Sequence, residues 1–203
     1  MGRPRSVKRL LLVRHAATAA TRSAAFPADE ALDERGLADA ATLARALPAA
    51  PGDVLTSPAL RCRQTAEAAG LEALRSHAAL AECDFGTWAG RTLEEVDAAD
   101  AAAATAWMTD PDAAPHGGES LTCFAARVAG WLDLQATRDG AAVAVTHGGV
   151  VKAAVVHALG APLAAFWRID VAPLAITELH AHGGRWTVTR VNATTATKIG
   201  AYA

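Results

Sequence analysis

Two short apolar runs, each followed by a histidine, constrain the fold of this chain more than any other feature. Residues 10–13 (LLLV) lead directly into Arg14 and His15, and residues 141–146 (AAVAVT) lead into His147. A continuous run of this kind is typical of a strand buried on both faces of a parallel sheet. Because ligands of open α/β sheets bind beyond the carboxyl ends of the strands, both histidines are predicted to lie at a binding crevice.

The rest of the chain predicts helices that alternate with strands. Ser57 and Pro58 have the pattern of a helix start, with serine as the N-cap and proline at the first helical position. The alternation predicts an α/β fold with a mostly parallel central sheet. We expect a substrate-contacting loop at 18–35, helices at 37–47, 59–69, 92–107, 121–136 and 148–159, and further strands at 53–56, within 74–80, at 175–180 and at 186–191.

The length of 203 residues, without an internal repeat or a linker, predicts a single domain over 1–203. Residues 1–8 are expected to be a disordered or extended N-terminus. The three cysteines are odd in number and widely spaced, and no CxxC pair occurs. This pattern disfavours both a disulfide framework and a zinc site, and it favours the reducing cytoplasm.

The net charge of −2 gives no reason to expect a nucleic acid or membrane partner. The apolar run at 10–13 is shorter than the roughly 7 to 15 residues of a signal-peptide core. No stretch approaches the roughly 20 apolar residues of a membrane span. The expected partner is therefore a small molecule, bound by a cytoplasmic monomer or homodimer.

Glycines and arginines at the same strand ends indicate that this ligand is an anion. Gly148 and Gly149 let backbone N–H groups at a helix N-terminus approach a negative group closely, although they also permit tight contact between strand and helix. Arg14 and Arg61 offer planar forks suited to phosphate oxygens. A single histidine at a strand end or a single arginine on a helix is often only a satisfied or solvated side chain. Their combination favours a phosphate site.

Five segments between residues 11 and 149 form an ordered set of motifs. They are LLVRHAAT at 11–18, TSPALRCRQTA at 56–66, LAECDFGTWAG at 80–90, GGES at 117–120 and THGG at 146–149. Together, and in this order, they resemble the histidine phosphatase (phosphoglycerate mutase-like) superfamily, in its small phosphatase branch. The resemblance implies a three-layer sandwich with a mostly parallel central sheet and helices on both faces.

The resemblance also implies a mechanism without a cofactor or metal. His15 would be the nucleophile and would take the phosphoryl group as phosphohistidine, which water then hydrolyses. Arg14, Arg61 and His147 would surround the phosphate and stabilise the charge on its oxygens. Glu82 would protonate the leaving alcohol and then activate water. Cations near His15 are expected to lower its pKa and keep it neutral, while its other ring nitrogen donates to a backbone carbonyl.

The first motif departs from the family pattern at three positions. Ala16 replaces the usual glycine, so the backbone there must avoid strongly positive φ. Ala17 replaces a frequent Glu or Gln, and Thr21 stands where the mutase branch often has Asn. Thr21, Arg22 and Gly148 are candidates for substrate binding, and for Arg22 a solvated surface position is an equal alternative.

Hydrolysis of small phosphomonoesters is the leading hypothesis, and three alternatives stay open. A cofactor-dependent phosphoglycerate mutase would carry Trp and Asn after the nucleophile, which residues 16–21 lack. A non-catalytic member of the family would bind phosphorylated ligands without turnover, but the five catalytic positions are all filled. A metal-dependent hydrolase would need carboxylates at ligand spacing around His15 or His147.

Overall fold

The computed structural model describes residues 7–194, so residues 1–6 of the expected extended N-terminus lie outside the described residues. The other two residues of that segment, Val7 and Lys8, begin the first strand. Within 7–194 a six-stranded sheet has the order β3-β2-β4-β1-β5-β6. The strands are β1 (Val7–Arg14), β2 (Asp53–Thr56), β3 (Arg75–Ser76), β4 (Gly140–Thr146), β5 (Ile176–His182) and β6 (Arg185–Ala193).

The sheet is mixed, with a parallel part and an antiparallel edge. β1 pairs in parallel with β4, β4 with β2, and β2 with β3. β5 runs antiparallel to β1, and β6 runs antiparallel to β5. Arg14 lies opposite Thr146 in the β1–β4 register, and the His15 N–H donates to the Thr146 carbonyl at 2.8 Å. The register therefore brings the two histidine-bearing strand ends side by side.

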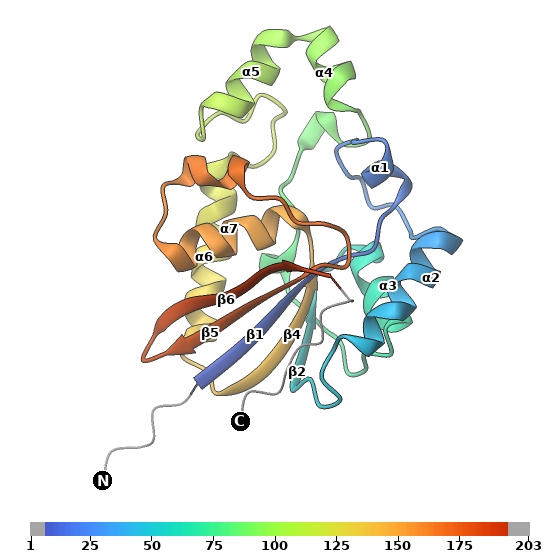
Figure 1. Ribbon diagram of the computed structural model, residues 1–203. Coiled ribbons are helices and arrows are strands. Elements are labelled where there is room, and N and C mark those ends of the chain that lie inside the picture. The colour runs from blue at the N-terminus through green and yellow to red at the C-terminus, as the bar shows by residue number, and fades with distance from the viewer. Residues whose placement is uncertain (1–6, 195–203) are drawn as a thin grey trace.

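Both faces of β1 are buried, as its apolar run predicts. Leu10 and Leu12 belong to a core on one face with α6 (Leu121–Ala136) and α7 (Gly148–Leu159), whereas Leu11 and Val13 face the opposite core. Side chains alternate between the faces of a strand, so one short segment supplies both cores. Figure 1 shows α6 and α7 on one side of the sheet and α2 and α3 on the other. The predicted α/β sandwich is confirmed.

The two helices on the second face differ slightly from their predicted bounds. α2 (Glu34–Thr42) begins three residues early because the Asp33 side chain accepts from the Gly36 N–H, and η1 (Leu43–Arg45) continues it. α3 (Leu60–Ala68) begins after Ala59, so Ser57 is not its N-cap. The Ser57 hydroxyl lies 2.8 Å from Nε2 of His147 and accepts from the Ala59 N–H at 3.2 Å, ahead of the helix.

The predicted 18–35 loop and 92–107 helix also differ in the structure. The first contains a short helix, α1 (Ala19–Arg22), which the Thr18 side chain caps. The second is two helices, α4 (Leu93–Ala99) and α5 (Ala101–Thr109), separated at Asp100. The Asp100 carboxylate accepts from the Ala103 N–H and thereby starts a new helix, since aspartate competes for backbone donors.

α4 and α5 form a lobe over the carboxyl ends of the parallel strands (Figure 1). Aromatic rings hold the lobe to the body, with the centroid of the Trp107 ring 5.3 Å from that of Phe26 and 4.9 Å from that of Trp167. Trp167 belongs to η4 (Leu163–Arg168), and two further short helices are η2 (Ala78–Leu80) and η3 (Gly86–Trp88). No helix within residues 7–194 has the length and apolar character needed to cross a membrane.

Candidate active site

The predicted site residues converge on two adjoining cavities beneath the α4–α5 lobe. The first has a volume of about 300 Å³ and is lined by Arg14, His15 and Thr21. The second, of about 290 Å³, is lined by Arg61 and His147. Glu82 lines both cavities. These six residues, from four separate parts of the sequence, therefore surround one region at the carboxyl ends of the strands, as the binding rule for α/β sheets predicts.

His15 directly follows β1 and is 5% exposed. Its Nδ1 lies 2.7 Å from the Ala16 carbonyl oxygen, to which it donates. Arg61 Nε donates to Nε2 of His15 at 3.2 Å. These two contacts leave the proton on Nδ1 and a lone pair on Nε2. Burial, followed by the charges of Arg61 and Arg14, lowers the pKa of His15 to about 3, so the ring is neutral at neutral pH.

Ala16 satisfies the backbone condition set by the missing glycine. Among residues 7–194 the non-glycine positions with positive φ are Ala24, Ala73, Leu174 and Asn192, and Ala16 is not among them. The Ala16 N–H donates to the Thr65 hydroxyl at 3.1 Å. This contact with α3 holds the peptide that follows the nucleophile candidate.

Arg61, in the first turn of α3, links the two histidines. Its Nη2 lies 3.1 Å from Nδ1 of His147, and its Nη1 donates to the Ala28 carbonyl at 2.7 Å. Only 3% of the residue is exposed, and a carboxylate oxygen of Glu30 lies 3.8 Å from Nη1. The guanidinium group of Arg61 is therefore a buried cation held by both histidines, the Ala28 carbonyl and the Glu30 carboxylate.

His147 is fully buried at the end of β4. Since Nδ1 accepts from Arg61, the ring proton lies on Nε2 and is donated to the Ser57 hydroxyl at 2.8 Å. Its centroid is 5.2 Å from that of His15. Burial, with His15 and Arg61 as further causes, lowers the pKa of His147 well below 6.5. The two neutral histidines thus carry their protons on opposite ring nitrogens.

Glu82 lies on the loop after η2, on the common wall of the cavities. Its Oε1 accepts from the Cys83 N–H at 3.1 Å and its Oε2 from the Gly149 N–H at 3.2 Å. Burial raises the pKa of Glu82, and the two backbone hydrogen bonds and the Arg61 and Arg14 charges oppose that rise. The net effect favours a protonated carboxyl, which a general acid requires.

The two glycines after His147 have different neighbours. A Cβ on Gly149 would lie 2.2 Å from Oε1 of Glu82, so only glycine lets the carboxyl lie against the start of α7. A Cβ on Gly148 would lie 3.4 Å from Nε of Arg14, an ordinary contact. The anion-facing amide predicted at this helix N-terminus is that of Gly149, and it faces a side-chain carboxyl.

The remaining predicted residues differ in whether they line the two cavities. Nη1 of Arg14 donates to the Val171 carbonyl, whereas its Nε has no hydrogen-bond partner among residues 7–194. Thr21 lines the first cavity with its hydroxyl 3.1 Å from that of Thr18. Arg22 is exposed, pairs with Asp33 and does not line either cavity. The structure therefore places Arg22 in the solvated position that was its alternative.

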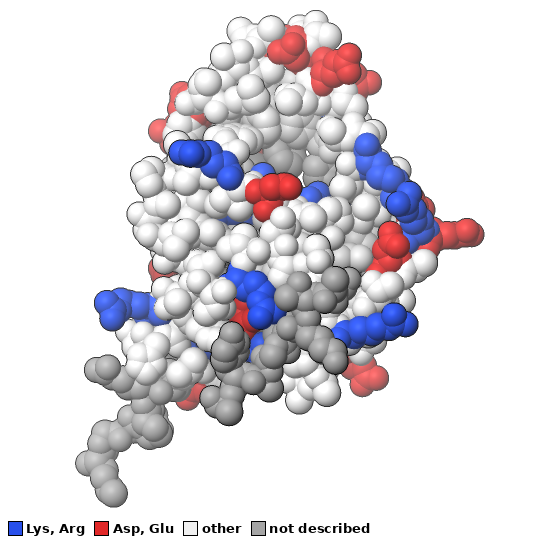
Figure 2. Space-filling view, in the orientation of Figure 1, with Lys and Arg blue, Asp and Glu red and all other residues white. Residues whose placement is uncertain are grey.

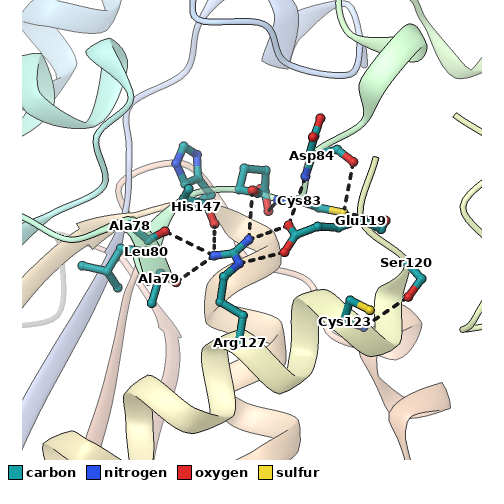
Figure 3. A network of polar contacts seen from close by, with 12 residues as sticks. Ala78, Ala79, Leu80, Cys83, Asp84, Glu119, Ser120, Cys123, Arg127 and His147 are labelled. Carbon is teal, nitrogen blue, oxygen red and sulfur yellow. Dashed lines mark hydrogen bonds and ion pairs between the residues drawn. The ribbon is translucent and has the colours of Figure 1, made fainter. Parts of the chain in front are cut away.

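Arg127 of α6 holds the Glu82 loop in place, a role that sequence patterns did not reveal. It forms a bidentate ion pair with Glu119, at 2.8 and 2.7 Å (Figure 3). Glu119 in turn accepts from the Asp84 N–H at 3.2 Å. The guanidinium group also donates to backbone carbonyls in the segment that leads to Glu82, the acid candidate. These carbonyls belong to Ala78, Ala79, Ala81 and Glu82.

Sequence patterns also assigned no role to Ser57 beyond a helix cap, or to Lys152. Lys152 lies four residues after Gly148 on α7, and positions i and i+4 share a helix face. That spacing was the available signal for placing Lys152 near the site. Within residues 7–194 no group of three or more His, Cys, Asp and Glu side chains has the arrangement of a metal site.

A sandwich with histidines and arginines gathered at its strand ends is suited to binding a phosphate group there. Residues 10–194 match the family model described as histidine phosphatase superfamily (branch 1). The chain belongs to this superfamily.

Named relatives agree with this membership. The chain is 29% identical over 196 residues to phosphoserine phosphatase 1 of Hydrogenobacter thermophilus, covering 92% of each protein. It is 33% identical over 175 residues to glucosyl-3-phosphoglycerate phosphatase of Mycolicibacterium vanbaalenii, covering 77% of this chain and 76% of the relative. The family and these names support phosphatase activity for this chain.

Solved structures show the same fold. The alpha-ribazole phosphatase of Shigella flexneri superimposes with a TM-score of 0.81 at 26% identity, covering 96% of this chain and 100% of the other. A mycobacterial glucosyl-3-phosphoglycerate phosphatase gives a TM-score of 0.77 at 29% identity, covering 93% and 100%. The central sheet and its flanking helices are therefore shared with phosphatases.

Proposed function

We propose that this protein is a metal-independent phosphomonoesterase that hydrolyses small phosphorylated metabolites through a phosphohistidine on His15. The observation that carries the proposal is the tautomer of His15. Its Nδ1 proton is held by the Ala16 carbonyl, so the lone pair is on Nε2, where it accepts from Nε of Arg61 at 3.2 Å until a phosphate group displaces that contact. His15 and Arg14 both line the first cavity. A neutral imidazole with an oriented lone pair among fixed cations is prepared to attack phosphorus.

In the first half-reaction Nε2 of His15 attacks phosphorus and forms an N–P bond while the ester P–O bond breaks. The leaving oxygen takes the proton of Glu82, so the alcohol departs neutral. Arg14 and Arg61 hold the non-bridging oxygens, which keep their charge throughout, and His147 orients the Arg61 guanidinium by accepting from its Nη2. Burial of the site strengthens each of these electrostatic contacts.

In the second half-reaction a water molecule gives a proton to the Glu82 carboxylate, and its oxygen attacks phosphorus. The N–P bond breaks, inorganic phosphate forms and His15 regains its lone pair. Glu82 is then protonated again, as the next turnover requires. Every atom and proton is restored, and no step of the proposed cycle passes through a metal or cofactor.

Trapping of the phosphoenzyme tests this mechanism. Rapid alkaline quenching with a ³²P-labelled aryl phosphate should give acid-labile label on the wild-type protein and none on His15→Ala. Turnover of the wild-type protein should persist after extensive chelation. His182→Ala, on an exposed residue of β5, is the matched control and should keep both label and turnover. Full turnover by His15→Ala, or complete loss with chelator, would overturn the proposal.

The same proposal covers the setting of the enzyme. We propose that the chain acts as a single catalytic domain in the cytoplasm, as a monomer or homodimer, and its free cysteines Cys62, Cys83 and Cys123 are compatible with a reducing compartment. Comparing kcat/KM over phosphorylated metabolites, including phosphoserine and glucosyl-3-phosphoglycerate, tests the substrate class. Faster isomerisation of 3-phosphoglycerate than hydrolysis of any ester would favour the mutase alternative.

A further inference from the structure

A third cavity adjoins the phosphate-facing ones on the other side of Glu82. It has a volume of about 170 Å³ and shares Glu82, Phe85 and Trp107 with the His15 cavity. Its other walls come mainly from Leu121, Phe124, Phe166 and Trp167, together with Lys152. Figure 2 shows the surface hollowed beneath the α4–α5 segment, where these cavities open.

The walls of this pocket favour an apolar occupant of limited size. An apolar cavity of roughly 150 Å³ holds one benzene molecule, so a pocket of about 170 Å³ accommodates an aryl ring or a short alkyl chain. The Phe166 and Trp167 rings stand nearly perpendicular, at 85°, with centroids 5.2 Å apart. Aromatic rings in this arrangement offer edges and faces to a flat ligand.

Lys152 adds one charge to this apolar lining. Its ammonium group lies 5.3 Å from the centroid of the Phe166 ring, and it forms no ion pair with any residue from 7 to 194. Burial lowers the pKa of Lys152, while Asp170 and Glu82 oppose that effect. A half-buried cation without a paired anion is costly, and a bound anion would relieve that cost.

The location of Glu82 decides which part of a substrate enters the pocket. The leaving oxygen must approach the Glu82 carboxyl to receive its proton, while phosphorus faces Nε2 of His15. The carbon skeleton attached to that oxygen therefore extends past Glu82, into the pocket that shares this side chain as a wall. Among the described lining residues Glu82 is the only carboxylate, so the pocket offers nothing further to pair with a cationic substituent.

We propose that this pocket binds the alcohol part of the substrate, and that Lys152 selects phosphomonoesters whose apolar or aryl alcohol carries a carboxylate. This inference rests on the proposed phosphatase function and specifies its substrate class. The apolar walls supply area for the body of the alcohol, and the ammonium group supplies the partner for its anion. Neutral alcohols of the same size gain only the apolar contact with the walls. Cationic alcohols bind more weakly because the ammonium group of Lys152 repels them.

Three aryl phosphates of similar shape test the inference: phenyl phosphate, 4-carboxyphenyl phosphate and 4-carbamoylphenyl phosphate. The quantity to compare is the ratio of kcat/KM for the carboxy ester to that for the carbamoyl ester. Dividing the wild-type ratio by that of Lys152→Met removes the intrinsic difference between the two leaving groups. We expect this quotient to be about tenfold or more, and Lys152→Glu to have a still lower ratio than Lys152→Met.

Controls separate charge from fold and position. Lys152→Arg should keep most of the wild-type preference, and Lys152→Gln is a second neutral variant if the methionine variant does not fold. Arg45→Met removes a cation from η1, on the opposite face of the sheet, and should keep the wild-type ratio. Benzoate should also inhibit the wild-type protein more strongly than benzamide, a difference that Lys152→Met reduces.

The outcomes distinguish the two levels of the proposal. If the wild-type protein hydrolyses none of the three esters, the proposed phosphatase function fails. If it hydrolyses all three but the neutral Lys152 variants keep the wild-type ratio, the phosphatase function stands and the Lys152 pocket is wrong. If Arg45→Met reduces the preference for the carboxy ester as much as Lys152→Met does, the effect comes from net charge and the pocket proposal is also wrong.

Discussion

The backbone amide of Gly149 donates to Oε2 of Glu82 at 3.2 Å, and a Cβ on the same glycine would lie 2.2 Å from Oε1. The start of α7 is thus shaped to the side chain of Glu82, the proposed acid. Gly149→Ala should displace the Glu82 carboxyl and lower kcat for alkyl phosphates by about 10²-fold, within the range for loss of one general acid.

Gly130→Ala is the matched control for that substitution. Gly130 lies in α6 with open space around its Cβ position, so alanine should raise the free energy of unfolding by about 0.5–1 kcal/mol and leave kcat unchanged. Steady-state kinetics and denaturant titration measure the two effects. Equal kinetics for Gly149→Ala and the wild-type protein would show that Glu82 tolerates the displacement.

Replacing the acid itself should depend on the leaving group. Glu82→Gln keeps the shape of the side chain but cannot deliver a proton, so esters of alcohols with high pKa should slow by about 10²–10⁴-fold. Esters of acidic phenols, which leave without a proton, should slow far less. A plot of log kcat against leaving-group pKa should therefore be steeper for the variant. Parallel plots for both proteins would argue against Glu82 as the acid.

The lowered pKa of His15 predicts how stability responds to acid. Its pKa is about 3 in the folded protein against an ordinary value of 6.5, so the unfolded chain binds more protons between these values. The free energy of unfolding should then fall as the pH falls from about 6.5 toward 3, with a slope of up to about 1.4 kcal/mol per pH unit from this group.

Comparison with His15→Gln isolates that contribution. The contribution of His147 to the free energy of unfolding changes with pH in the same direction, because its pKa is lowered too. The pKa of Glu82 is raised, so its contribution to stability decreases as the pH rises. Urea titrations at pH 7 and pH 5 should give a smaller difference for His15→Gln than for the wild-type protein. Identical differences would mean that His15 titrates alike in both states.

Arg127 is expected to act on catalysis through position alone. Arg127→Lys keeps the charge but loses the fork that reaches Glu119 and the η2–Glu82 backbone together. We expect a loss of about 2–4 kcal/mol in the free energy of unfolding and a steeper leaving-group dependence, like that of Glu82→Gln. Arg63→Lys, on an exposed residue of α3, is the control. An unchanged leaving-group dependence would limit Arg127 to stability.

The strand ends were predictable because continuous apolar runs and strand-end polarity are local signals. The runs at 10–13 and 141–146 are sufficient to locate Arg14, His15 and His147 at the ends of buried strands, and the parallel pairing of β1 with β4 makes them neighbours. Arg61 and Glu82 depended on the family motifs, since a helical arginine and a loop carboxylate have no distinguishing local pattern.

What the sequence did not reveal are particular side-chain contacts, most of them between distant segments. Ser57 has the local pattern of a helix cap, but its hydroxyl lies 2.8 Å from Nε2 of the distant His147, and α3 begins only at Leu60. Asp100 divides a helix because its carboxylate bonds to a nearby amide instead of solvent. The role of Arg127 follows from carbonyls almost fifty positions earlier in the chain, which no periodicity reports.

The central position of β1 affects how the enzyme is made. The first strand of the chain completes its pairing only with β4 and β5, which are formed by residues 140–146 and 176–182. Contacts of such long sequence separation form slowly, since loop-closure entropy must be lost before pairing stabilises them. His15 is therefore synthesised well before residues 140–182, and the candidate site around it can assemble only after those later strands have been made.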